Sequence, residues 1–136
     1  MPTLNPYLTF NNNCREAMSF YQSIFGGEIT LMPVKDTPVC DQVPASMQDC
    51  ILHAELKAAN FSIMGSDMAP EAMNDGNTNH MSLGYKTEAE TREVFDKLSA
   101  GGRVTQPLNK MFFGWIGSLE DKFNKRWIVV CDESRN

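Results

Sequence analysis

Two segments of the sequence show the same order of features, 75 residues apart. Each contains a short strand-like run, a helix with a capping signal, a Gly-Gly pair and a second strand-like run. The offset relates Phe20 to Phe95, and Gly26-Gly27 to Gly101-Gly102. An ordered set of matches favours an internal duplication over the alternative of two unrelated α+β segments. The sequence therefore predicts an α+β protein made of two tandem βαβββ modules.

Capping signals and apolar spacing define the helix expected in each half. Asn13 and Glu16 have capping-box spacing in the first half, as Thr87 and Glu90 have in the second. Apolar side chains then recur at helical spacing. They are Ala17, Phe20, Tyr21, Ile24 and Phe25 in the first half, and Val94, Phe95 and Leu98, with Thr91, in the second. A Gly-Gly pair follows each stripe and can provide the left-handed residue that ends a helix.

Each half also contains two further strand candidates. They are Cys50–Lys57 and Phe61–Ser66 in the first half, and Met111–Ser118 and Arg126–Cys131 in the second. Lys35–Asp49 reads as a long polar loop, and Asp121–Lys125 as a hairpin turn. We expect one domain with a first module at about residues 1–67, a linker at 68–79 and a second module at about 80–136.

Composition narrows the classes of partner. The 136 residues carry a net charge of −5, which argues against nucleic acid, because phosphate binding requires a basic surface. The apolar runs are too short to cross a membrane, and the N-terminus lacks the pattern of a secretion signal. The four cysteines form no CxxC pair. These features predict a cytoplasmic protein with reduced thiols.

Strand alternation identifies candidate site residues. Where helices cover only one face of a sheet, the apolar residues of each strand face the helix and the others face away. This places His53, Glu55 and His80 away from the helices, where they are candidates for acid–base catalysis. The same reasoning, together with an aromatic cluster, gives the candidate ligand-binding residues. They are Asn5, Tyr7, Ser82, Phe113, Trp115 and Trp127.

Each candidate also has a purely structural interpretation. His53 and His80 are compatible with hydrogen-bonded structural histidines, and Glu55 with a solvated sheet edge. Trp115 and Trp127 are compatible with a packed core, and alternation does not assign their faces because both sides of these strands are bulky. The sequence alone leaves these alternatives open.

Four motifs resemble a known superfamily over nearly the whole chain. They are PYLTFNNNCREAMSFYQSIFGGEI at residues 6–29, HAEL at 53–56, IMGSD at 63–67 and GWIGSLEDKFNKRWIVV at 114–130. Together they resemble the vicinal oxygen chelate superfamily, and most closely its PhnB-like branch, which is often labelled demethylubiquinone-methyltransferase-like. The resemblance implies the glyoxalase/bleomycin-resistance fold, with eight strands in a curved cup, and a homodimer.

The metal ligands of the superfamily are not matched in this chain. The resemblance implies His, Gln or Glu ligands on the first and last strands of each module. Here Asn5 and Pro6 lie near the first position, Phe61–Ser66 holds no Glu or His, and Val129 replaces an expected Glu, so His80 alone fits well. We therefore expect no metal. No Gly-rich loop follows a strand, so we expect no cofactor either.

Three functions remain open. The first is a metal-free protein that binds a small organic molecule in the cup. The second is an enzyme, of lyase, isomerase or dioxygenase type, in which His53, Glu55 or His80 acts as acid, base or atypical metal ligand. The third is a structural or regulatory dimer whose cup has no ligand. Whether the protein is an enzyme, and what its ligand is, do not follow from the sequence.

Overall fold

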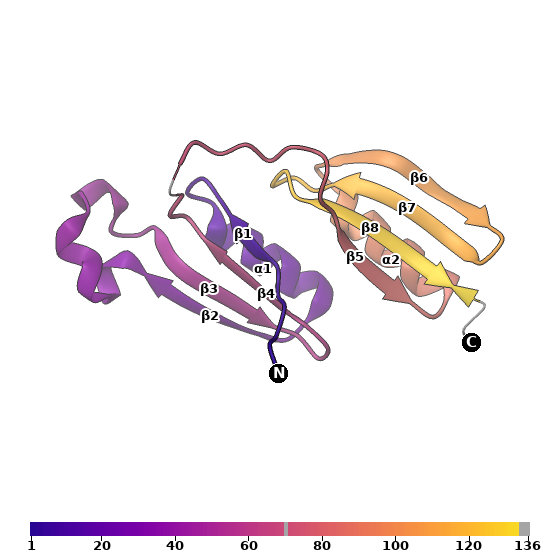
Figure 1. Ribbon diagram of the computed structural model, residues 1–136, viewed down its shortest axis with the longest axis horizontal. Helices are drawn as coiled ribbons and strands as arrows, with labels where there is room; N and C mark the ends of the chain where they lie inside the picture. The colour runs from indigo at the N-terminus through magenta and orange to yellow at the C-terminus, as the bar shows by residue number, and fades with distance from the viewer. Residues whose placement is uncertain (70, 134–136) are drawn as a thin grey trace. The chain divides into compact units, whose positions relative to one another are not determined.

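The computed structural model describes residues 1–69 and 71–133. The chain forms two compact units, Met1–Met73 and Asn74–Asn136, and each follows the order βαβββ (Figure 1). The strand orders are β1-β4-β3-β2 and β5-β8-β7-β6, so corresponding strands occupy corresponding places in the two sheets. The predicted α+β class and the duplication are confirmed. The boundary between the units lies inside the stretch predicted as a linker.

Among its described residues, unit 1 contains one α-helix and four strands. The elements are β1 (Tyr7–Thr9), α1 (Cys14–Phe25), β2 (Glu28–Pro33), β3 (Ile51–Lys57) and β4 (Ser62–Ser66). Strand β1 pairs with β4 in parallel, and the other neighbours are antiparallel. Helix α1 lies against one face of the sheet (Figure 1), and its buried residues are Cys14, Ala17, Met18 and Tyr21, while Phe20, Ile24 and Phe25 of the predicted stripe are half-buried. This burial forms the core of unit 1.

Unit 2 repeats this arrangement. Its elements are β5 (Met81–Tyr85), α2 (Glu88–Ser99), β6 (Arg103–Met111), β7 (Gly114–Glu120) and β8 (Arg126–Asp132). The strand predicted at Met111–Ser118 is wrong at its start, because Met111 ends β6 and the chain turns at Phe112-Phe113. Hydrophobic residues on both sides of this turn hid it in the sequence. The hairpin turn predicted between β7 and β8 is confirmed.

The two helices are capped in different ways. In α2 Thr87 caps the helix as predicted, because its Oγ1 accepts a hydrogen bond of 3.2 Å from Glu90 N and donates one of 3.0 Å to Glu90 Oε1. In α1 the prediction is wrong, because Asn13 has a ψ of 20° and its side chain makes no capping bond. Instead Asp67 Oδ1, from the residue after β4, accepts a hydrogen bond of 3.0 Å from Cys14 N. A residue distant in sequence thus stabilises the start of α1.

The stretch predicted as the long polar loop Lys35–Asp49 has regular structure. It contains three 3₁₀ helices, at Val34–Asp36, Pro38–Gln42 and Ala45–Met47. The side chain of Gln48 crosslinks the stretch, because its Nε2 lies 2.8 Å from Cys40 O and 3.2 Å from Val43 O. Unit 2 has the two-residue turn Phe112-Phe113 at the corresponding place. The two modules therefore differ most in the connection between their second and third strands.

Within the described residues, neither helix has the length and apolar character that crossing a bilayer requires.

Candidate functional site

The surroundings of Gly65 establish which residues of unit 1 face away from α1. A Cβ atom added to Gly65 would lie 3.0 Å from Phe10 Cε2 and 3.3 Å from Cys14 Sγ, so Gly65 faces the helix. Ala54, its partner in β3, is fully buried on the same side. His53 and Glu55 therefore face away from α1, as alternation predicts. We call this surface the distal face of unit 1. From the strand registers it comprises Tyr7, Thr9, Thr30, Met32, His53, Glu55 and Met64.

Two of the predicted site residues are in contact on this face. Tyr7 on β1 and His53 on β3 come from strands separated by β4, and the Tyr7 hydroxyl lies 3.1 Å from His53 Nδ1. The rings are also close, with centroids 5.7 Å apart and a tilt of 33°. Tyr7 is 52% exposed, and His53 is half-buried. The contact orients the imidazole and couples its tautomer to the hydroxyl.

Methionine side chains surround this polar pair. Met32 is the cross-strand partner of His53, and Met64 is the partner of both Tyr7 and Glu55. Met32 is 43% exposed, while Met64 and Glu55 are half-buried. Methionine is flexible and adapts to ligands of different shape. A hydrogen-bonding pair on such a surface is suited to recognise an organic molecule, and an imidazole beside a phenol is suited to transfer a proton.

The face assignment in unit 2 corrects the expectation for the two tryptophans. A Cβ atom added to Gly117 would lie 2.8 Å from Phe95 Cε2, so Gly117 faces α2, and Trp115 lies on the same side of β7. Arg92 of α2 stacks over the Trp115 ring at 5.1 Å. Trp127 is 1% exposed and belongs to the core of unit 2. Both tryptophans, predicted to bind a ligand, are thus on the α2 side of the sheet.

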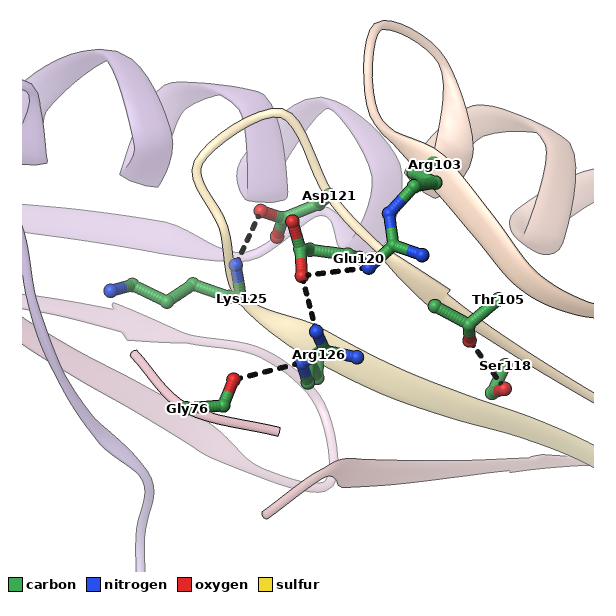
Figure 2. Close-up of polar contacts among 8 residues, drawn as sticks. All are labelled: Gly76, Arg103, Thr105, Ser118, Glu120, Asp121, Lys125 and Arg126. Carbon is green, nitrogen blue, oxygen red and sulfur yellow. Dashed lines mark hydrogen bonds and ion pairs between the residues drawn. The ribbon is translucent and has the colours of Figure 1, made fainter. Parts of the chain in front are cut away.

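The distal face of unit 2, which points away from α2, was largely missed by sequence reasoning. From the strand registers it includes Ser82, Gly84, Arg103, Thr105, Gln106, Asn109, Met111, Ile116, Ser118, Glu120, Arg126, Ile128, Val130 and Asp132. Figure 2 shows its polar contacts: Thr105 Oγ1 lies 2.6 Å from Ser118 Oγ, and Glu120 pairs with both Arg103 and Arg126. The signal in the sequence is the alternation of Ser118 and Glu120 with the apolar Leu119.

The other predicted residues are not grouped with Tyr7 and His53. His80 is exposed and precedes β5, so the expectation that it belongs to this strand is wrong. Asn5 is half-buried and precedes β1. Ser82 is exposed on the distal face of unit 2. Phe113 is half-buried in the β6–β7 turn, with its ring centroid 5.2 Å from that of Phe112. The structure therefore groups Tyr7, His53 and Glu55.

The donors that a divalent metal requires are missing at the positions which the superfamily implies. Val129 is fully buried on the α2 side of β8, and its neighbours on the distal face are the aliphatic Ile128 and Val130. Strand β4 has the sequence Ser-Ile-Met-Gly-Ser. Among residues 1–69 and 71–133, no three His, Cys, Asp or Glu side chains are grouped as a metal site would need. The residues present do not fit a divalent ion.

Comparison with known proteins identifies the family. The profile of the family described as 3-demethylubiquinone-9 3-methyltransferase matches residues 2–130. Protein YjdN of Escherichia coli (strain K12) is 29% identical over 136 residues, covering 93% of this chain and 92% of that protein. The crystal structure of protein PA1353 from Pseudomonas aeruginosa matches with a TM-score of 0.86 and 35% identity, covering 97% of this chain and 98% of that one.

A more distant structure shows how widely the fold is shared. The glyoxylase/bleomycin resistance protein/dioxygenase domain from Frankia sp. EAN1pec matches with a TM-score of 0.60 and 18% identity, covering 97% of this chain and 98% of that domain. The resemblance predicted from the four motifs is thereby confirmed. The chain belongs to the family described as 3-demethylubiquinone-9 3-methyltransferase and has the glyoxalase/bleomycin-resistance fold.

Proposed function

We propose that the protein binds a small organic molecule without a metal ion, and that the distal face of unit 1 supplies the polar anchor. The observation that carries this proposal is the 3.1 Å contact between the Tyr7 hydroxyl and His53 Nδ1. The contact fixes two hydrogen-bonding groups on a surface that Met32 and Met64 make apolar and adaptable. An oriented polar pair within an apolar surface is the usual composition of an organic-ligand site.

The same contact supports catalysis as the second candidate function. A phenol that hydrogen-bonds the imidazole sets which nitrogen of His53 carries the proton, and this prepares the ring for acid–base chemistry. Glu55 lies two residues along the same strand face. The reaction class would be a proton transfer on the bound molecule. This proton transfer requires neither a metal ion nor a methyl donor.

The proposal predicts that His53 and Tyr7 control ligand affinity. We expect a screen of neutral phenols and aromatic amides, followed by ¹H–¹⁵N NMR, to identify binders that shift the amide signals of both residues. Because a hydrogen bond contributes about 1 kcal/mol net, Tyr7→Phe should weaken binding about fivefold. His53→Ala removes the ring contact as well and should weaken binding about tenfold or more.

Two variants serve as matched controls. Tyr85→Phe makes the same change on the α2 side of unit 2, and His80→Gln changes the other histidine, which is exposed outside β5. Neither should alter the affinity. Equal losses in Tyr7→Phe and Tyr85→Phe, or the absence of any binder, would contradict the proposal. If His53→Gln binds a molecule that only the wild-type protein converts, the catalytic function is supported instead of binding alone.

We also propose that the protein is a homodimer. Strands β2 and β6 lie at the ends of the strand orders of their sheets, and edge strands favour association. Phe112 is 97% exposed in the turn after β6, next to Met111 at 42%, so this turn presents contiguous apolar surface that a second copy would cover. Sedimentation analysis should give twice the chain mass of 15.3 kDa, and Phe112→Ser should shift the protein toward monomer. A monomer at all concentrations would contradict this proposal.

We further propose that the protein works in the cytoplasm, where thiols stay reduced. Cys14, Cys40, Cys50 and Cys131 are all free, and only Cys40 is partly exposed. Burial, with a smaller effect of the Asp67 carboxylate, raises the pKa of Cys14 to about 12. This thiol therefore stays protonated at neutral pH, which suits apolar packing and not nucleophilic chemistry.

A further inference from the structure

A row of three charged side chains crosses the distal face of unit 2. Arg103 on β6, Glu120 on β7 and Arg126 on β8 lie side by side at the same end of their strands (Figure 2). Glu120 Oε2 accepts from both arginines, at 2.7 Å from Arg126 Nη2 and 3.4 Å from Arg103 Nη2. One carboxylate faces two guanidinium groups, so the row carries one surplus positive charge. This is a local feature in a chain whose net charge is −5.

The surplus charge lies at Arg103. The Arg126 side chain is 15% exposed, makes the shorter ion pair and donates from Nε to Gly76 O at 3.0 Å. The Arg103 side chain is 61% exposed, and its ion pair is long for a charge-assisted hydrogen bond. Arg103 therefore keeps donors that a second carboxylate can occupy. Lys125, the nearby residue of the β7–β8 turn, is paired with Asp75 at 2.9 Å.

The surface next to this row changes from polar to apolar along β7 and β8. Ser118 lies two residues before Glu120 on β7, and its Oγ lies 2.6 Å from Thr105 Oγ1. A pair of hydroxyl groups therefore adjoins Arg103. The next side chains of β7 and β8 on this face are aliphatic: Ile128, Ile116 and Val130. On β6 the polar Gln106 and Asn109 pair with Ser118 and Ile116. The remaining acid of the face, Asp132 at the other end of β8, is six residues from Arg126, or about 20 Å. No carboxylate other than that of Glu120 lies near Arg103 on the described strands of this face.

We infer that this face binds the anionic head group of an organic acid, with Arg103 as its charged partner and the Thr105–Ser118 hydroxyls as hydrogen-bonding groups. The apolar part of the ligand packs on Ile128 and Ile116. A guanidinium group is suited to this role because its planar donors match a carboxylate in two parallel hydrogen bonds. The inference goes beyond the proposed function, because it assigns a second site, on the distal face of unit 2, and names the charge class of the ligand that this site binds.

The test compares benzoate with benzamide, which have the same shape and differ in charge. We expect benzoate to shift the amide signals of Arg103, Thr105 and Ser118 in ¹H–¹⁵N NMR titrations. It should bind about fivefold more tightly than benzamide at low salt, as expected for an exposed ion pair, and added salt should reduce the difference. Arg103→Gln should abolish the preference for benzoate, while Arg103→Lys should keep part of it, because lysine retains the charge but not the planar donors.

Arg92→Gln is the matched control, because Arg92 lies on α2 and pairs with Glu88 at 3.2 Å. Its side chain is 49% exposed, which is close to the value for Arg103, but it lies on the other side of the sheet. This variant should keep the full preference for benzoate. Equal affinity for benzoate and benzamide, no binding of benzoate, or equal losses in Arg92→Gln and Arg103→Gln would each overturn the inference. Neutral ligands that still bind at Tyr7 and His53 would then preserve the proposed function.

Discussion

Asp121→Ala should lower the free energy of unfolding of unit 2 by about 3–5 kcal/mol. The Asp121 carboxylate is 1% exposed and organises the β7–β8 turn. Its Oδ1 accepts from Phe123 N at 2.8 Å and Lys125 N at 3.0 Å, and its Oδ2 accepts from Trp127 Nε1 at 2.9 Å. Alanine would leave all three donors without this acceptor inside the protein, and an unpaired buried donor costs about 1–3 kcal/mol.

Intrinsic fluorescence during urea unfolding measures this effect well, because both tryptophans, Trp115 and Trp127, lie in unit 2. Asp121→Asn keeps an oxygen for the two backbone donors but loses one acceptor, so it should cost clearly less than Asp121→Ala. Asp96→Ala, at an exposed position of α2, is the matched control and should change stability by less than about 0.5 kcal/mol. A cost for Asp121→Ala similar to that of Asp96→Ala would contradict this account of the turn.

The elements that the sequence predicted correctly depend on local chemistry. The Thr87 cap of α2 joins residues three positions apart, and the glycines after each helix have the expected positive φ, at 72° for Gly26 and 77° for Gly101. The cap of α1 could not be predicted in this way. It comes from Asp67, which also accepts from Ile51 N at 2.8 Å and so joins the start of α1 to the start of β3. Such a contact depends on how strands pair.

The candidate site was predicted where one face of a strand is clearly apolar. On β3 the buried Ala54 and Leu56 alternate with His53 and Glu55, so the distal face follows directly from the period of two. On β7 both faces carry bulky residues, and the position of Gly117 against Phe95 decides the assignment. The charged row was missed for a further reason. The arginines that flank Glu120 lie on different strands and become neighbours only through the register of the sheet.

The duplication makes a second prediction with a large effect, at the glycines that directly precede the second strand of each module. Gly27 and Gly102 are 75 residues apart, and a Cβ atom on either would collide with a backbone carbonyl, that of Lys57 or that of Glu120. In both units the residue after the glycine pairs with the residue that carries this carbonyl. The missing side chain therefore allows the first residues of β2 and β6 to pair with the last residues of β3 and β7 at equivalent places.

Gly102→Ala should therefore destabilise unit 2 by about 1–3 kcal/mol, because the backbone must move to accommodate a methyl group. Gly27→Ala should cost unit 1 more, about 3 kcal/mol or above, because Gly27 also has a φ of 93°, which residues with a side chain rarely adopt. Gly84→Ala is the matched control, since a Cβ atom there meets nothing within 4 Å. Urea unfolding monitored by circular dichroism measures all three. If Gly84→Ala and Gly102→Ala proved equally stable, the close approach of Gly102 to the Glu120 carbonyl would have no effect on the stability of unit 2. The repeated glycines would then need another explanation than the equivalent strand pairs.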